Sequence, residues 1–130
     1  MQSNFGRRED FTVLGVPVGR HITDGKLRGR EQGSIIAIVA TDAPLLPHQL
    51  KRLARRVPLG LARTGTVANN SSGDIFLAFS TANEQAFAQR RGPVRMEALC
   101  NGDIDPLFRA TVEATEESVI DAMLMAETMT

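Results

Sequence analysis

Ser34 is the residue most clearly placed to take part in a reaction. It stands directly before an unbroken apolar run, Ile35–Ala40. A serine at the start of a buried strand is commonly a plain edge residue whose hydroxyl bonds water or backbone. If the chain were cut between Gly33 and Ser34, the serine would also carry a free α-amine, which titrates at about pH 7.7–8.0. Such a residue is a nucleophile that contains its own general base. The spacing alone does not choose between these interpretations.

A second polar pair, Ser72 and Asp74, precedes the apolar run Ile75–Phe79. On extended backbone, residues i and i+2 point to the same side, so these two side chains can act together. The starts of two apolar strands are rigid places at which polar groups can converge. The alternative is an Asn/Ser/Gly turn that only satisfies its own backbone. Local sequence favours the turn.

Two strands and the helix between them must position these residues. Residues 34–41 and 74–80 are apolar and rich in β-branched or aromatic side chains, which predicts buried strands. Pro47 suits the first turn of a helix, which weakens or continues beyond Pro58. An apolar stripe at helical spacing supports that helix: Leu46, Leu50, Leu53 and Val57.

The other segments complete an α+β or layered α/β pattern. Residues 11–18 predict two short strands around a tight turn near Gly15, and residues 20–33 predict an exposed loop in which a cut is physically reasonable. Residues 81–103 predict a crossing loop, and a final helix is expected over about 106–127 with Asp105 as its N-cap. Strands buried on both faces need more cover than two helices supply.

Composition excludes several function classes. The chain has 130 residues, a formal net charge of zero and no apolar run long enough to span a membrane. Its start lacks the pattern of a signal peptide. Cys100 is the single cysteine, and the two histidines, His21 and His48, lack metal-ligand spacing, so neither a disulfide nor a metal is expected.

Charged and sulfur-containing clusters have ordinary interpretations. A basic helix face can bind phosphates, but a solvated face is commoner, so no nucleic-acid partner is expected. The basic face comprises Lys51, Arg52, Arg55 and Arg56. The acidic residues Glu113, Glu116, Glu117 and Asp121 are expected on a wet helix face, and Met123–Met125 is expected in the core.

Together, these stretches resemble the self-processing serine aminopeptidases, the group of L-aminopeptidase/D-esterases and β-peptidyl aminopeptidases. The longest matching run is Ala40–Arg56, ATDAPLLPHQLKRLARR. The other matching stretches are Gln2–Gly6, Gly15–Gly19, Gly33–Ile36, Ser72–Phe76 and Ala114–Glu117. The resemblance covers nearly the whole chain.

The resemblance implies an α+β chain that is part of a four-layer αββα sandwich, similar to N-terminal-nucleophile hydrolases. Residues 1–130 would form a single partial domain. Residues 1–33 would be the end of a large subunit and residues 34–130 most of a small one. Members are at least about twice this length, so the chain is expected to be incomplete, with the missing segment supplying strands, a helical layer and pocket residues.

The resemblance also implies a site. Self-cleavage between Gly33 and Ser34 would release Ser34 as the nucleophile. Ser72 and Asp74 match the pair that orients this nucleophile and its amine, and Asn4 matches the asparagine of the oxyanion hole. Some β-peptide specialists carry glutamate where this chain has Asp74, so the preference among L-, D- and β-amino acids stays open.

The implied activity is hydrolysis of N-terminal residues from peptides, amides or esters, without a cofactor. The alternatives are a truncated, non-catalytic remnant and a relative of glutamate N-acetyltransferases, which are expected to use threonine as the nucleophile. Implied partners are a small peptide or amino-acid amide as substrate, the missing large-subunit segment, and further copies in a homo-oligomer of processed heterodimers. The expected compartment is the cytoplasm, or the periplasm if the missing N-terminal part carries a signal.

Overall fold

Strand β2 (Ser34–Thr41) is the centre of a three-stranded sheet with the order β1-β2-β3. The computed structural model describes residues 1–25, 33–88 and 91–127. Strand β3 (Gly73–Ser80) runs parallel to β2, with Ser34 opposite Gly73 and Thr41 opposite Ser80. Strand β1 (Gln2–Asn4) pairs antiparallel with β2, with Asn4 opposite Ser34. Both apolar strands predicted from the sequence are therefore present, whereas β1 was not predicted.

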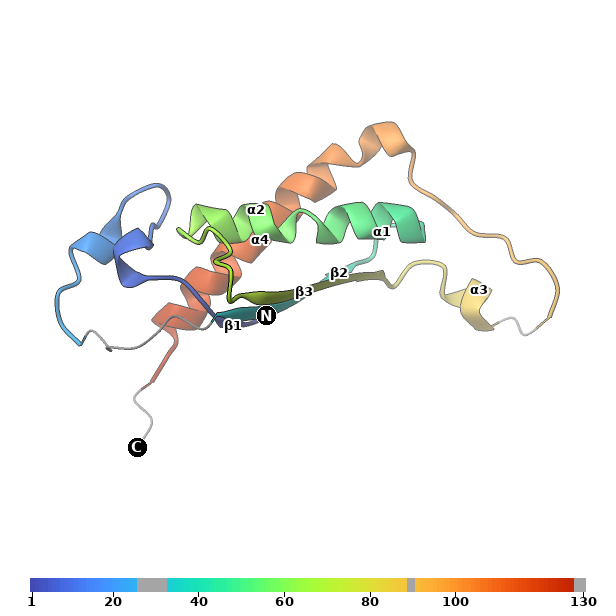
Figure 1. Ribbon diagram of the computed structural model, residues 1–130. Helices are drawn as coiled ribbons and strands as arrows, with labels where there is room; N and C mark the ends of the chain where they lie inside the picture. Colours follow the sequence, from blue (N-terminus) through green and yellow to red (C-terminus); the bar gives the residue numbers. More distant parts are fainter. Residues whose placement is uncertain (26–32, 89–90, 128–130) are drawn as a thin grey trace.

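Helices α1 (Pro47–Ala54) and α2 (Val57–Arg63) form the crossover that a parallel strand pair requires. The helix is interrupted at Arg55 and Arg56, just before Pro58, where a weakening was expected. Helix α4 (Asp105–Leu124) crosses on the same side of the sheet (Figure 1). It ends earlier than predicted, and its N-cap is Ile104 rather than Asp105.

The core lies between these helices and one face of the sheet. One cluster joins Ile35 and Ala37 of β2 to Val57 and Leu61 of α2 and Val119 of α4. A second cluster is formed by Leu45, Leu53, Ile104 and Phe108. Such apolar burial is the main favourable contribution to folding.

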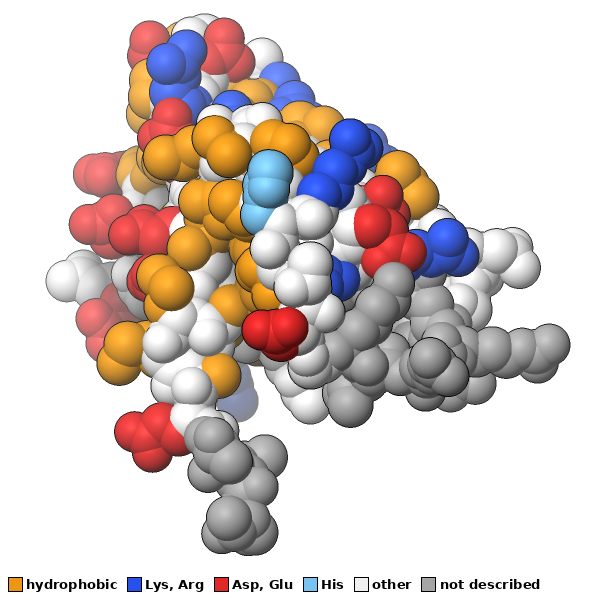
Figure 2. Space-filling model, turned by 90° about the vertical axis from the view of Figure 1, so that its left-hand side faces the viewer, with side chains coloured by type: hydrophobic (Ala, Val, Ile, Leu, Met, Phe, Trp, Pro, Cys, Tyr) orange, Lys and Arg blue, Asp and Glu red, His pale blue; other side chains and the backbone are white. Residues whose placement is uncertain are grey.

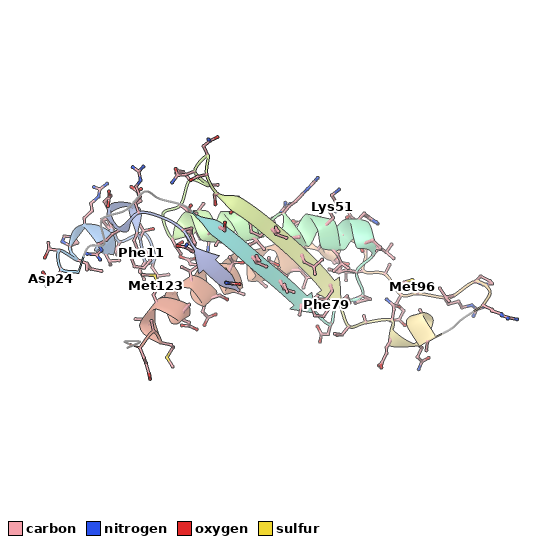
Figure 3. The ribbon with its side chains drawn as sticks, turned by 60° about the horizontal axis from the view of Figure 1, so that its bottom comes forward. Phe11, Asp24, Lys51, Phe79, Met96 and Met123 are labelled. Atoms are coloured by element: carbon pink, nitrogen blue, oxygen red, sulfur yellow. The ribbon has the colours of Figure 1, made fainter. Side chains whose placement is uncertain are left out.

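The opposite face of the sheet is open, which corrects the prediction that both strands are buried on both faces. Side chains alternate along a strand, so every second residue of β2 and β3 points to this face. Figure 3 shows the two strands in front of the helices. The large apolar side chains exposed on these strands are Ile36, Ile38, Ile75, Leu77 and Phe79. We call these five side chains the open sheet face.

The N-terminal segment differs from its prediction of two strands over 11–18. Two 3-10 helices, η1 (Arg8–Asp10) and η2 (Val18–Arg20), flank an isolated bridge between Val13 and Val16. The tight turn near Gly15 is present, with positive φ of 48° at Leu14 and 80° at Gly15. Both φ values suit a hairpin turn, but the chain on either side packs locally instead of extending into strands.

The segment over 81–103 contains two short helical pieces, α3 (Glu84–Ala88) and η3 (Asn101–Asp103). Leu99 ties it to the crossover, because its carbonyl accepts a hydrogen bond of 2.9 Å from Gln49 Nε2. Of the loop predicted over 20–33, residues 26–32 lie outside the described residues. In the described part of the chain, no helix is long and apolar enough to cross a membrane.

Two expectations for α4 were wrong. Glu116 is buried rather than wet, and its Oε2 lies 3.0 Å from Nη1 of Arg63 on α2. The apolar group at the end of α4 is exposed rather than buried: Met123 is 53% exposed, Leu124 76% and Met125 80%. Figure 2 shows hydrophobic side chains gathered at the end of the molecule that carries residues 5–25 and the end of α4.

Replacing Gly60 by alanine is expected to destabilise the fold by about 1–3 kcal/mol. A Cβ at Gly60 would lie 2.5 Å from the carbonyl oxygen of Val112 and 2.6 Å from Thr115 Cβ, so α2 and α4 would have to separate. This strain outweighs the helix-propensity gain of about 1 kcal/mol. Urea denaturation measures the effect. Gly102→Ala is the control, because no atom lies within 4 Å of its Cβ position; a Gly60→Ala protein as stable as this control would contradict the prediction.

Candidate active site

Ser34 and Asn4 lie together at one end of the open sheet face. Ser34 is the exposed first residue of β2, and it alternates in direction with the buried Ile35. Asn4 is its cross-strand partner on β1. Directly opposed residues of two paired strands project to the same face. The pairing therefore places a hydroxyl and a carboxamide side by side on a surface that no described segment covers.

Gly73 flanks Ser34 on the other side, at the start of β3. A Cβ built on Gly73 would lie 3.6 Å from Ser34 Oγ, which is ordinary van der Waals contact. The N–H of Gly73 donates a hydrogen bond of 3.2 Å to the carbonyl oxygen of Gly33. The carbonyl of the Gly33–Ser34 peptide bond is thus fixed by the first hydrogen bond between β2 and β3.

Ser72 and Asp74 form a hydrogen-bonded pair on either side of Gly73. Ser72 Oγ donates to Asp74 Oδ1 at 2.7 Å, which agrees with the expectation that the two side chains point the same way. The turn interpretation also has support, since Ser72 N–H donates to the carbonyl of Asn69 at 2.8 Å. The pair combines a carboxylate with a hydroxyl that holds it in place.

The register places this pair on the helix-covered side of the sheet. Asp74 is opposite Ile35, which is buried in the core, whereas Ser34 is opposite Gly73. The Asp74 carboxylate and Ser34 Oγ therefore project to opposite faces of the sheet. The two groups are connected through the backbone of Gly73, which lies between Ser72 and Asp74. Its N–H donates a hydrogen bond to the carbonyl of Gly33, the residue before Ser34.

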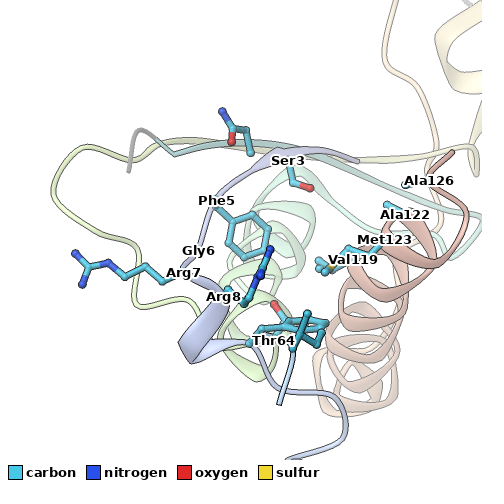
Figure 4. Close-up of a pocket in the computed structure, with 13 residues that line it drawn as sticks. Ser3, Phe5, Gly6, Arg7, Arg8, Thr64, Val119, Ala122, Met123 and Ala126 are labelled. Carbon is cyan, nitrogen blue, oxygen red and sulfur yellow. The ribbon is translucent and has the colours of Figure 1, made fainter. Parts of the chain in front are cut away.

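The described residues contain a hollow of about 600 Å³ beside β1, on the side of α4 (Figure 4). Ser3, Phe5 and Arg8 lie on one side of it, and Val119 and Met123 lie on the other. Asn4 also contributes to its lining, but Ser34, Ser72 and Asp74 do not. The hollow is mainly a gap between β1 and the end of α4, and Ser34 does not line it.

Two arginines of the basic helix face contact other residues of the fold. Arg52 and Arg56 lie over the ring of Phe108, with guanidinium carbons 5.1 and 4.0 Å from its centroid. Arg52 Nη1 also donates to Asn101 Oδ1. Cation–π contacts of this kind stabilise helix packing. Among the described residues, no group of three or more His, Cys, Asp or Glu side chains could hold a metal ion.

Comparison with known proteins decides the family. A sequence profile described as peptidase family S58 matches residues 1–130. The chain belongs to peptidase family S58. It is 40% identical over 145 residues to the β-peptidyl aminopeptidase BapA of Sphingosinicella microcystinivorans, a match that covers 100% of this chain and 37% of that protein.

Solved structures confirm the fold class. An L-aminopeptidase D-Ala-esterase/amidase from Ochrobactrum anthropi, described as a prototype of the serine aminopeptidases, superimposes with a TM-score of 0.85 at 45% identity, covering 97% of this chain and 34% of that one. The PH0078 protein of Pyrococcus horikoshii OT3 gives 0.84 at 49% identity, covering 98% and 35%. The Ochrobactrum structure is a variant of the Ntn hydrolase fold. The S58 chain is an α+β part of this fold, and it spans little more than a third of its relatives' length.

Sequence reasoning missed two parts of the site. Strand β1 carries no apolar alternation in Gln2–Asn4, so only its pairing with β2 identifies it. The Gly73 N–H was overlooked because a backbone donor leaves no mark on residue type. The one available signal was a glycine between two polar residues at the start of an apolar strand.

Proposed function

We propose that this S58 chain is the part of a self-processing serine aminopeptidase that contains the cleavage site, the nucleophile and the groups around them. The observation that carries the proposal is the strand register. It places Ser34 at the exposed start of β2, between Asn4 on β1 and Gly73 on β3. Family membership and the aminopeptidase relatives support the same reaction class.

Self-cleavage would begin with attack by Ser34 Oγ on the Gly33 carbonyl carbon. The Oγ–carbon bond forms, the carbon–nitrogen bond to Ser34 breaks, and the proton lost by Oγ passes to the departing nitrogen. Water then hydrolyses the resulting ester, which frees the Gly33 carboxylate and restores the Ser34 hydroxyl. Ser34 is left with a free α-amine, the base that an N-terminal nucleophile requires.

Substrate hydrolysis would repeat this chemistry on an external amide or ester. Ser34 Oγ attacks the carbonyl carbon, its proton passes to the α-amine, and the leaving group takes that proton as its bond to the carbonyl carbon breaks. Water then hydrolyses the ester on Ser34, which releases the acid and restores the hydroxyl. The Asn4 carboxamide donates to the developing oxyanion. Ser72 and Asp74 would hold the new amine once cleavage frees residue 34 from its strand geometry, with the negative Asp74 carboxylate favouring the protonated amine. No cofactor enters either step.

The proposed substrates are peptides, amino-acid amides and esters with a free N-terminus. The relatives include enzymes named for β-peptidyl substrates and for L-aminopeptidase and D-Ala-esterase activity. Initial rates on the p-nitroanilides of L-alanine, D-alanine and a β-amino acid distinguish these classes. If the folded, complemented chain hydrolysed none of these compounds, the proposed function would be wrong.

The proposed partner is the large-subunit segment that relatives carry beyond this chain's length. The open sheet face and the exposed end of α4 are apolar surfaces that a second sheet and further helices would cover. We expect processed heterodimers to assemble into a homo-oligomer, in the cytoplasm or, with a signal on the missing part, in the periplasm. Experiments on activity therefore supply the remainder of a relative in trans.

A non-catalytic remnant is the second candidate, and the uncovered surfaces are the observation that favours it. A remnant retains the scaffold but cannot complete the substrate pocket. Supplying the remaining segment separates the candidates, because only an enzyme is restored by it.

Replacing Asn4 by alanine is expected to lower kcat by about 10²–10³, the usual effect of losing one oxyanion donor. The loss should appear in the complemented protein on an amino-acid p-nitroanilide. Gln2→Ala is the matched control, since Gln2 is an amide side chain on the same strand and, by alternation, on the same face, opposite Ile36 instead of Ser34. Equal kcat values for the two variants would show that Asn4 does not stabilise the oxyanion.

A further inference from the structure

The N-terminal segment, residues 1–25, is fastened to the rest of the chain at a second place besides β1. Thr12 binds the end of α2 through two hydrogen bonds. Its N–H donates to the carbonyl of Thr64 at 3.2 Å, and its Oγ1 donates to the carbonyl of Arg63 at 2.5 Å. The last carbonyls of a helix have no partner within the helix. Thr12 therefore supplies donors to two acceptors at the end of α2, beside which the segment lies (Figure 1).

Gly65 allows the two backbones to approach closely at the same point. A Cβ built on Gly65 would lie 1.8 Å from the carbonyl oxygen of Asp10 and 2.5 Å from its carbonyl carbon, so a side chain here would displace the segment. The φ of 104° at Gly65 also favours glycine. The neighbouring Thr64 is buried. We call Arg63, Thr64 and Gly65 the anchor site.

The shape of the segment does not depend on the peptide bond before Ser34. The Arg8 guanidinium donates to the carbonyls of Asp24 and Gly25, at 2.5 and 2.9 Å. These hydrogen bonds close the segment on itself ahead of residue 26. A cut before Ser34 would therefore leave both the fold of the segment and its contacts with the anchor site intact.

We propose, building on the proposed self-cleavage, that the anchor site is a docking site that keeps residues 1–25 bound after the chain is cut before Ser34. Strand β1 is a weak connection, since it pairs only three exposed residues, Gln2–Asn4, with β2. An isolated pair of short strands is at best marginally stable in water. The anchor site supplies the rest of the attachment, together with Phe5, which is half-buried and packs against the core cluster of β2 and α2.

The anchor site thereby determines where Asn4 lies in the cut protein. Cutting before Ser34 leaves Asn4 and Ser34 on separate chains, opposite each other on β1 and β2. Their proximity then depends on the affinity of the segment instead of on a covalent link. We expect the activity of the processed protein to fall on dilution when the anchor site is weakened, because dissociation of the segment removes Asn4.

The test cuts the chain with an added protease, so that it does not require self-cleavage. A recognition sequence for a specific protease replaces residues 26–32 in the Ser34→Ala chain, which is cut after assembly with the remainder of a relative. Native mass spectrometry over a dilution series gives the Kd of the cut N-terminal segment. We expect the reference segment to stay bound and Thr12→Val to raise its Kd about tenfold, because valine keeps the N–H but removes the Oγ1 donor.

Thr23→Val is the matched control. Thr23 is exposed in the same segment, and its Oγ1 donates to Asp24 Oδ1 at 3.4 Å instead of to the anchor site, so the Kd should not change. Thr12→Ser keeps the hydroxyl and should retain the reference affinity. Gly65→Ala tests the other side of the contact, and it should raise the Kd by about tenfold or more. Its control is Gly15→Ala, which also has a positive φ, of 80°, but has no atom within 4 Å of its Cβ position.

Equal Kd values for Thr12→Val and Thr23→Val would overturn the docking site, and so would a reference segment that dissociates as soon as it is cut. Should Thr12→Val not fold, Gly65→Ala and Gly15→Ala decide, and equal Kd values for these two overturn the docking site as well. The proposed function fails on a different result. A chain that retains Ser34, folds with its complement and never cuts itself contradicts self-cleavage, whereas the Kd of the protease-cut segment is unaffected.

Discussion

Replacing Ser34 by alanine is expected to abolish self-cleavage and to lower substrate hydrolysis by a factor on the order of 10⁶, as loss of a catalytic nucleophile does elsewhere. The alanine keeps the backbone of β2, but no atom remains to attack the Gly33 carbonyl. Ser34 is exposed, so the free energy of unfolding should change by less than about 0.5 kcal/mol. Intact mass and p-nitroanilide hydrolysis measure the two activities in the complemented protein.

Two variants make this result specific. Ser34→Cys restores a nucleophile at the same position and should recover self-cleavage in part. Ser118→Ala removes an exposed serine hydroxyl from α4, whose Oγ only donates to the carbonyl of Ala114 at 2.7 Å, and it should behave like the parent. Parent-like hydrolysis by the Ser34→Ala protein would show that another residue is the nucleophile.

Replacing Asp74 by asparagine is expected to slow substrate hydrolysis by about 10²–10⁴, the usual contribution of a positioned acid–base group. Asparagine has nearly the same shape, and its Oδ1 can still accept the hydrogen bond that Ser72 Oγ donates at 2.7 Å. The variant therefore removes the charge that would hold the Ser34 amine while keeping the local geometry. Initial rates in the complemented protein measure the loss.

Asp42→Asn is the matched control for this charge. Asp42 is exposed and follows β2, at the opposite end of the parallel pair from Asp74. The Asp42→Asn variant therefore removes one negative charge at a position far from Ser34. Ser72→Ala should reproduce part of the Asp74→Asn effect, since it frees the carboxylate from its hydroxyl partner. If Asp74→Asn and Asp42→Asn react at the same rate, Asp74 has no part in the reaction.

The sequence predicted the elements whose side-chain pattern is strong. β2, the crossover helix and β3 each carry an apolar pattern long enough to identify them, whereas the parallel pairing of the two strands comes from the structure. β1 escaped prediction because three exposed residues, Gln2–Asn4, gain strand geometry only by pairing with β2. Glu116 was placed on the wet face because its partner, Arg63, is brought to it by the packing of α2 on α4.

The candidate site was predictable in composition but not in arrangement. The i, i+2 spacing anticipated the shared side of Ser72 and Asp74, and the polar residues that precede both apolar strands suggested that the two strand starts converge. The placement of Ser34 on the open face and Asp74 on the covered face depends on register, and a shift of one residue would reverse it. Register arises from packing across the sheet, which local sequence does not encode.

Self-cleavage at Gly33–Ser34 is the central claim, and the mass of the folded chain tests it most directly. The 14.1 kDa chain is incubated with the remainder of a relative, and its products are analysed by intact mass and N-terminal sequencing. We expect two products, residues 1–33 and residues 34–130, with Ser34 as the new N-terminus. A chain that folds with its complement and stays intact, or is cut at another bond, would contradict the claim.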